Sequence, residues 1–513
     1  MSPLPSGLSR RTAAGTVCVA LLATAACTSD PDDGPAAGSS SPSAAPELSS
    51  AITGVEATTT PVLVGGEPWL RITGTLSGVV DPAEEVAGLE DLPKDADGRY
   101  AYTAGFEVVT PEAATNGGVV LVEAENRGLA LFLRSLQPAQ PGPADLGDGA
   151  LATGGLSYAR VQWQTGIAAG VPEDAQGVGE VIVRDFGRML EGATRPVGTS
   201  DIPEFGGSIL AGVSQAGWFV DTFVAEGFNA GPEGGVYDAA VALDGTGNWL
   251  AINQLADGAV QTPYALQDGE PLTYDELLTR PDSDPLFVDV ANYTDYYRLR
   301  ASVAAGDDLP EGVVRYDWPA PHASTVAGPA LVFGATNPDG GGGFGCNGGV
   351  QVPLNPVDYG PFLRTLVVRL AGVVAGDGGL PDPALFTLED APAGSPESFN
   401  GLPGVELQVP AVDEDSGQPV GGVRFPDAEA PLGRPTPVSL PPVEIDGLTS
   451  ICGNFGGWQP FSAAELADRY GDVDGYLTEY TAALDAAVED GYLDETERAG
   501  LLTAARTAYT AAG

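Results

Sequence analysis

The sequence has few positive charges and a large excess of negative ones. Its 513 residues include 22 Lys and Arg against 70 Asp and Glu, and the formal net charge is −48 at pH 7. A nucleic-acid-binding protein needs clustered cations to displace the counterions of the phosphate backbone, so nucleic acid is not expected as a partner. The same charge repels acidic molecules, and the sequence shows no basic patch that would attract them. A small neutral substrate is therefore favoured.

Residues that bind transition metals are equally scarce. The chain has one histidine, His322, and four cysteines, of which Cys18 and Cys27 lie near the N-terminus. Cys346 and Cys452 remain as an even pair, and we expect a disulfide between them in an oxidising compartment, with two buried free thiols as the alternative. A zinc site needs several Cys or His ligands that converge, so this composition predicts no metal site.

Apolar runs long enough to span a membrane are absent beyond the N-terminus, which itself has the features of an export signal. Arg10 and Arg11 precede an apolar run from Ala13 to Ala26 that is too short to cross a bilayer. Cys27 follows two alanines, as at the end of a bacterial lipobox, although Thr24 stands where leucine is usual. We therefore predict lipidation of Cys27 and an extracytoplasmic protein anchored to the cell membrane, with ordinary secretion or a retained anchor as the alternatives.

The chain divides into four predicted segments. Residues 1–26 form the lipoprotein signal peptide, and residues 27–48, rich in Ser, Pro, Ala, Gly and Asp, form a disordered tether. Residues 49–390 are expected to hold the core with an N-terminal β extension, and residues 391–513 an irregular and helical region packed on it. With 43% hydrophobic residues, a chain of this length can bury one large core or two domains.

Strand and helix patterns alternate along most of the sequence. Residues 51–80 alternate apolar and polar side chains, which indicates antiparallel strands at the start. Further strands are expected at 119–122, 158–163, 208–213, 285–291 and 312–318, and helices at 178–190, 218–224 and 359–374. Near the C-terminus, apolar residues recur every four positions from Tyr476 to Val488 and predict a helix. The fold class is therefore α/β, with a mostly parallel sheet flanked by helices.

A candidate nucleophile lies between a predicted strand and a predicted helix. In the segment from Gly212 to Gly217, Ser214 has small residues two positions away on either side, as a sharp nucleophile-bearing turn requires. The same pattern occurs around Ser157, but Ser157 enters a strand, whereas Ser214 leaves one for a helix. Ser214 is thus the candidate nucleophile, and a serine that caps the helix is the alternative.

A serine nucleophile needs a base, and an imidazole is the usual one because it changes charge near working pH. His322 follows the predicted strand 312–318 in a loop that contains Pro319 and Pro321. A surface or structural histidine is the alternative. The position after a strand near the end of the predicted sheet favours the role of base.

The third member of a catalytic triad is a carboxylate that orients the imidazole. Asp295 follows the predicted strand 285–291 and is the candidate, with Asp289, Asp307 and Asp308 as alternatives. The chain order Ser, Asp, His is the order found in α/β-hydrolases.

An oxyanion intermediate would need backbone N–H donors beside Ser214. We expect the amide of Gln215 to be one, and an amide of the loop after the predicted strand near residue 119 to be the other, with Asn126 and Arg127 as candidates. A plain turn at the end of that strand is the alternative.

Several short motifs resemble a family of bacterial proteins known as the alpha/beta hydrolase domain-containing group. They occur in the same order along the chain: Glu125-Asn126-Arg127-Gly128, Val183-Arg184-Asp185-Phe186, Val213-Ser214-Gln215, Val236-Tyr237-Asp238, Pro319 to His322, Asn355 to Gly360, Gly421 to Pro426, Pro460-Phe461-Ser462 and Gly491-Tyr492-Leu493. The resemblance implies an α/β-hydrolase core and gives Ser214, Asp295 and His322 the triad roles. The chain departs from the family at Tyr293, because the family tends to have Glu-Thr-Asp where this chain has Tyr-Thr-Asp.

These features together predict two-step acyl transfer on a small neutral carboxylic ester, with amides or lactones as the next choices and no cofactor. The alternative from another class is a cell-surface binding lipoprotein that keeps a hydrolase-like fold without turnover.

Overall fold

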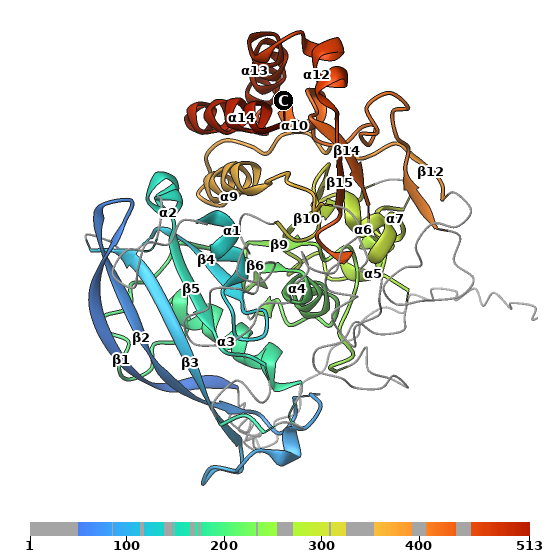
Figure 1. Cartoon of the computed structure of the whole chain (residues 1–513). Coiled ribbons are helices and arrows are strands. Elements are labelled where there is room, and N and C mark those ends of the chain that lie inside the picture. Colours follow the sequence, from blue (N-terminus) through green and yellow to red (C-terminus); the bar gives the residue numbers. More distant parts are fainter. Residues whose placement is uncertain are drawn as a thin grey trace, which may run out of the picture. The chain divides into compact units, whose positions relative to one another are not determined.

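In the computed structural model of the chain, a long antiparallel hairpin forms one end of the main sheet, and the parallel strands lie beyond it (Figure 1). The structure describes residues 50–84, 86–112, 117–137, 146, 149–164, 170–172, 175, 177–231, 234–253, 270–306, 309–324, 353–391, 407–437 and 453–512. The predicted signal peptide and tether, the lipidation site Cys27, the disulfide partners Cys346 and Cys452, and the alternative acids Asp307 and Asp308 lie outside these residues.

Within the described residues, one sheet has nine strands in the order β1-β2-β3-β5-β4-β6-β9-β10-β11. Their bounds are Ala51–Val64 (β1), Glu67–Val80 (β2), Tyr100–Pro111 (β3), Val119–Ala124 (β4), Ser157–Val161 (β5), Gly207–Val213 (β6), Ala239–Leu243 (β9), Leu286–Asn292 (β10) and Val313–Trp318 (β11). The first three strands are antiparallel to their neighbours, and β3 joins β5 in the same way. From β5 to β11 all pairs are parallel. The predicted fold class is confirmed.

Helices cover both faces of the sheet. The two faces are visible in β4, where Val120 and Val122 pack into one apolar cluster and Leu121 packs into the other. The first cluster includes α3 (Val178–Leu190) and α4 (Gln215–Ala225). The second includes α1 (Leu131–Leu136), α2 (Ala150–Gly154), α9 (Gly360–Val374) and α13 (Val473–Glu489). Both faces of the sheet are therefore covered by apolar side chains, as is usual for a parallel sheet.

The C-terminal region is helical, as predicted. Tyr476, Tyr480 and Leu484 are the buried face of α13, and α12 (Ala463–Tyr470) and α14 (Arg498–Ala512) lie beside it, in red in Figure 1. No helix in the described part of the chain is long and apolar enough to cross a membrane.

The sheet register brings four strand ends to one edge. Val213 at the end of β6 is paired with Leu243 of β9, Leu243 is paired with Val290 of β10, and Asn292 of β10 is paired with Trp318 of β11. Because the strands are parallel, the loops that follow them all emerge at the same edge. Ser214, Asp295 and His322 all belong to these loops or to the helices that follow.

Candidate active site

Ser214 occupies a strained turn between β6 and α4. Its backbone has φ +57° and ψ −124°, a conformation that residues other than glycine rarely adopt. A Cβ added at Gly212 would lie 2.1 Å from the carbonyl oxygen of Ala216, and one at Gly217 would lie 2.7 Å from that of Leu243. Small residues are thus required around Ser214. The Ser214 side chain makes no capping hydrogen bond to α4, which removes the main alternative to a functional role.

The competing serine has a structural position. Ser157 is the first residue of β5, is 5% exposed, and has its hydroxyl 3.0 Å from that of Thr110 on the neighbouring strand β3. This hydrogen bond joins two strands and accounts for a buried hydroxyl. Ser157 also begins its strand, whereas Ser214, Asp295 and His322 follow the ends of theirs.

The structure brings Ser214, His322 and Asp295 into one hydrogen-bonded chain. The Nε2 atom of His322 lies 2.9 Å from the Ser214 hydroxyl, and its Nδ1 atom lies 2.7 Å from Oδ1 of Asp295. His322 is 4% exposed and Asp295 is fully buried, whereas Ser214 is partly exposed. The imidazole thus lies between a buried carboxylate and the hydroxyl of a partly exposed serine.

Asp295 is held by the start of a helix. It is the third residue of α6 (Tyr293–Arg298), which begins directly after β10, and its Oδ2 accepts a hydrogen bond from the backbone N–H of Asn292 at 2.8 Å. This pairing fixes the carboxylate and leaves its Oδ1 directed at His322.

The alternative acid Asp289 lies inside β10 and belongs to a different buried cluster, which we call the Arg315 cluster: Tyr274, Asp289, Tyr296, Arg315 and Asp317. Arg315 on β11 lies 2.9 Å from an oxygen of Asp317 and 3.5 Å from one of Asp289. The two tyrosine hydroxyls donate to these carboxylates. The partners of Asp289 are thus Arg315 and Tyr274, within the sheet and apart from the hydrogen bonds of His322.

A second carboxylate beside His322 was missed by sequence reasoning. Asp244 follows β9, is fully buried, and adopts φ +60°. Its Oδ1 accepts from Nδ2 of Asn292 at 2.6 Å, and its Oδ2 lies 3.8 Å from Nδ1 of His322. Burial, with the negative charge of Asp295, raises the pKa of the Asp244 carboxyl well above its usual range. The sequence offered one sign of this role, because Asp244 is an acidic residue directly after the apolar run from Ala239 to Leu243. That run forms β9, which is not among the strands expected from the sequence.

Asp244, Asp295 and His322 are also the one group of described residues whose potential ligand atoms all lie close enough for a metal ion, within 4.8 Å of one another. However, both ring nitrogens of His322 are already engaged with Ser214 and Asp295. With one ring nitrogen protonated toward Asp295 and the lone pair of the other accepting from Ser214, the arrangement suits proton transfer.

The loop after β4 is bound directly to the strand that ends at Ser214. The Asn126 side chain donates from Nδ2 to the carbonyl oxygen of Val213 at 2.9 Å, and its backbone N–H donates to the carbonyl of Leu129 at 3.0 Å. Arg127 adopts φ +52° and donates from its guanidinium to Oδ1 of Asn126. The amide of Asn126 is thus engaged within its own turn, and Asn126 fixes the distance between the loop and Ser214. Gln215 is the first residue of α4 and is fully buried.

Glu123 supports the other end of this loop. Its carboxylate accepts from the backbone N–H groups of Phe132 and Leu133 at the start of α1, at 2.7 and 3.0 Å, and from the hydroxyl of Tyr158 at 2.8 Å. Burial raises the pKa of Glu123 to about 7, against the opposing effect of these donors. The loop is therefore tied to β6 at one end and to β4 at the other.

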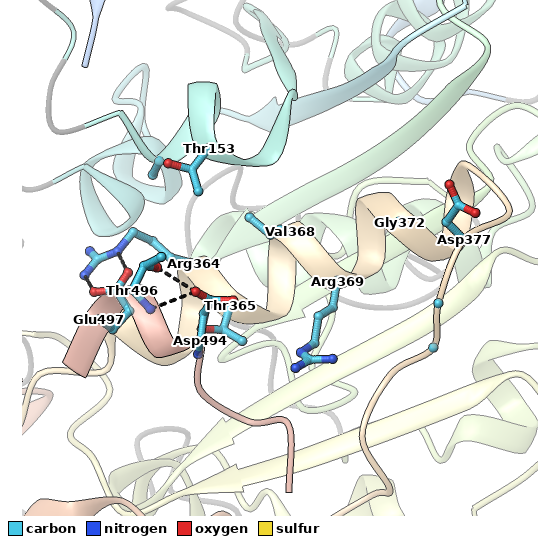
Figure 2. A pocket seen from close by; sticks show the side chains of 13 residues that line it. Thr153, Arg364, Thr365, Val368, Arg369, Gly372, Asp377, Asp494, Thr496 and Glu497 are labelled. Carbon is cyan, nitrogen blue, oxygen red and sulfur yellow. Dashed lines mark hydrogen bonds and ion pairs between the residues drawn. The ribbon is translucent and has the colours of Figure 1, made fainter. Parts of the chain in front are cut away.

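A cavity of about 540 Å³ lies along α9, away from these residues (Figure 2). Its walls include Thr153 of α2, Arg369 of α9, Asp494 and the pair Arg364 and Glu497, whose two hydrogen bonds measure 2.7 and 2.6 Å. None of the candidate catalytic residues lines it. This cavity is therefore separate from the hydrogen-bonded chain at Ser214.

Comparison with known proteins identifies one family. A family model described as an alpha/beta hydrolase domain matches residues 145–503. No curated protein is significantly similar to the chain in sequence.

Three solved structures illustrate the weaker likenesses. One of two fungal esterases from Rhizomucor miehei is 9% identical, with 63% of this chain and 85% of that chain covered and a TM-score of 0.30. A glucuronoyl esterase from Teredinibacter turnerae is 13% identical, with 53% and 75% covered and a TM-score of 0.29. A dienelactone hydrolase from Anabaena variabilis is also 13% identical, with 52% and 84% covered and a TM-score of 0.24. Likenesses this distant carry no conclusion about the substrate of this chain.

Proposed function

The chain belongs to the alpha/beta hydrolase domain family, and from this premise we propose that it is a serine hydrolase that cleaves carboxylic esters. One observation carries the proposal: the sole imidazole of the chain lies 2.9 Å from a hydroxyl on a strained turn and 2.7 Å from a buried carboxylate. Ser214 is the nucleophile, His322 the general base and Asp295 the residue that orients it.

In the first step, the Ser214 hydroxyl donates its proton to Nε2 of His322 while Oγ attacks the ester carbonyl. The Nδ1–H group of His322 donates to Asp295, whose negative charge stabilises the imidazolium that forms. His322 then returns the proton to the departing alcohol. Water attacks the acyl-enzyme in the second step by the same route in reverse, which restores the Ser214 hydroxyl and releases the carboxylic acid.

The tetrahedral intermediates of both steps carry a negative oxygen that needs N–H donors. We assign these donors to the backbone amides of Gln215 and Arg127. Gln215 follows the nucleophile at the start of α4, where the helix dipole also favours negative charge. Arg127 lies in the loop that Asn126 ties to Val213, whereas the amide of Asn126 itself is engaged by Leu129. Asn126 is thus a positioning residue.

The proposed substrate is small and neutral. The formal charge of −48 opposes the approach of acidic molecules, and the proposed mechanism requires no charged group on the substrate. Esters come first because an alcohol leaves more readily than an amine from the tetrahedral intermediate. Amides and lactones are the next substrates to assay.

Hydrolysis of a panel of neutral p-nitrophenyl esters tests the proposal. Ser214→Ala should lower kcat/KM by about 10⁵-fold or more, as for loss of other serine nucleophiles. The matched control is Ser157→Ala, which removes a serine from the same sequence pattern and should keep wild-type activity. Loss of activity in both variants, or in neither, would contradict the role of Ser214. A folded protein with no turnover of any ester would favour a binding function.

We further propose that the enzyme is exported and anchored to the cell membrane through a lipid on Cys27, which is supported by the N-terminal sequence alone. Cys27→Ser should move the protein from the membrane fraction to the soluble fraction. Retention of the variant in the membrane fraction would contradict lipid attachment at this residue.

A further inference from the structure

Two buried carboxylates lie beside the same nitrogen of His322. Asp295 Oδ1 is 2.7 Å from Nδ1, and Asp244 Oδ2 is 3.8 Å from it. The two carboxylates are bridged by one residue: the backbone N–H of Asn292 donates to Asp295, and its side chain donates to Asp244. Both aspartates are fully buried. The proposed mechanism uses only one of them.

The Asp244 carboxyl has an oxygen without a donor. Its Oδ1 is satisfied by Asn292, whereas its Oδ2 is buried and has no hydrogen-bond partner among the described residues. A buried carboxylate oxygen in this state is costly, because neither water nor a donor compensates the charge. The cost disappears if this oxygen carries a proton, since the O–H group can donate to the neighbouring carboxylate of Asp295.

Arg298 of α6 is a buried cation, but it acts on Asp295 and donates to Asn454. Among the described residues, the groups that act most strongly on Asp244 itself carry no permanent positive charge. They come from four parts of the fold: Asp289 of β10, Asp295 of α6, His322 after β11 and Tyr359 before α9. Two of these are acids, and Tyr359 is a buried phenol. Burial and the negative charge of Asp295 both raise the pKa of Asp244, in agreement with a neutral carboxyl.

We propose that Asp244 is a positioning residue that holds a proton in the resting enzyme and donates it to Asp295, and that ionises to take over as the partner of His322 when Asp295 is replaced. The inference rests on the proposed function for its catalytic meaning. In the resting enzyme, Asp244 and Asp295 then carry one negative charge between them. This charge lies on Asp295, which is hydrogen-bonded to the imidazole. When Asp295 is absent, Asp244 loses its proton to solvent, and its Oδ2, 3.8 Å from Nδ1, becomes the partner of the ring.

His322 makes this inference directly measurable, because it is the only histidine and its ring C–H signals need no assignment. The experiment follows these NMR signals against pH in the purified full-length protein, without substrate. Four forms are compared: wild type, Asp244→Asn, Asp295→Asn and the double variant. Asn at position 244 keeps one acceptor for Asn292 and one donor for Asp295, and it tolerates the positive φ, so this variant should fold.

The expected order of titration midpoints separates the possible roles. Asp244→Asn should leave the midpoint within about 0.3 pH units of wild type, since it replaces one neutral donor by another. Asp295→Asn should lower the midpoint by about one unit, and the double variant should lower it by about one unit more, because no carboxylate then remains beside the ring.

Two results would overturn the inference. A drop of one unit or more in Asp244→Asn would mean that Asp244 is ionised in the wild type. Equal midpoints in Asp295→Asn and the double variant would mean that Asp244 does not take over. If Asp295→Asn fails to fold, Asp295→Ala takes its place in the series. The comparison of the His322 titration midpoint between Asp244→Asn and the wild type does not depend on either variant. Failure of the proposed function would appear separately, as absent ester hydrolysis in a wild type whose histidine still titrates.

Discussion

Two buried charged clusters share the strands β10 and β11, yet only one of them has the geometry for chemistry. The Arg315 cluster lies within the strands, and its cation is matched by Asp289 and Asp317, with two tyrosine hydroxyls that also accept from the guanidinium. The cluster around His322 lies at the strand ends and includes the hydroxyl of Ser214, a partly exposed residue. Burial and charge are therefore not enough to mark an active site, and the strand end is the distinguishing feature.

The backbone separates the two clusters as well. At the strand ends, Ser214 and Asp244 both adopt positive φ, at +57° and +60°, whereas Asp289, Arg315 and Asp317 lie in regular parallel strands. Strained conformations persist only where the surrounding structure enforces them, and they gather at functional sites. We infer that the sheet stabilises itself through the Arg315 cluster and uses its carboxyl edge for the reaction.

The largest expected effect comes from removing the base. His322→Gln should lower kcat/KM on a neutral ester by about 10⁵- to 10⁶-fold, because the nucleophile and base act as a unit. The thermal midpoint should change little by comparison. Residual activity within tenfold of the wild type would mean that another group accepts the Ser214 proton.

A change in the Arg315 cluster should instead lower the stability and leave the activity nearly unchanged. Arg315→Met leaves Asp289 and Asp317 buried without their cation, and should lower the free energy of unfolding by about 3–5 kcal/mol, measured by urea denaturation. The kcat/KM of the folded fraction should remain close to wild type. A further change of both aspartates to Asn should restore much of the stability. If Arg315→Met lost activity without losing stability, the proposed difference between the two clusters would be wrong.

A smaller effect is expected at the loop that supplies the second oxyanion donor. Asn126→Ala removes the donor to the carbonyl of Val213 and should lower kcat/KM by about 10- to 100-fold, less than loss of a direct oxyanion donor in the strongest cases. The fall should be mainly in kcat, because the transition state depends on the donor position more than the bound substrate does. A change confined to KM would argue against this positioning role.

The smallest effect concerns stability and pH. Burial raises the pKa of Glu123 to about 7 in the folded state, above its value in an unfolded chain, so the folded state holds its proton to higher pH. The unfolded state therefore binds fewer protons between about pH 4.5 and 7, and stability should fall by about 1–3 kcal/mol as pH rises through this window. Glu123→Gln should flatten this part of the urea-denaturation profile, and an unchanged slope in the variant would contradict it.

The sequence predicted the elements with long, regular patterns. The helix 178–190 and the strand ending near Val213 match α3 and β6, and the order of Ser214, Asp295 and His322 anticipated loops at one edge of a parallel sheet. These predictions succeed because apolar periodicity and strand-to-helix turns are local signals.

The missed features depend on contacts between distant segments. Asp244 follows the short strand β9, whose five residues carry a weak pattern, and its importance arises only where Asn292 and His322 meet it. The amide of Asn126 was a candidate oxyanion donor in the sequence, and only the turn closed by Leu129 reveals that this group is engaged. Arg315 lay in a predicted strand, with no sequence sign that its charge would be buried between two acids.

Labelling of the folded wild-type protein with a fluorophosphonate probe, followed by mass spectrometry of its peptides, would show which residue is the nucleophile. We expect a single modified residue, Ser214, with labelling lost in Ser214→Ala and strongly slowed in His322→Gln. Labelling that persists in Ser214→Ala, or a folded wild type that takes up no label, would contradict the assignment of Ser214 and His322 as nucleophile and base.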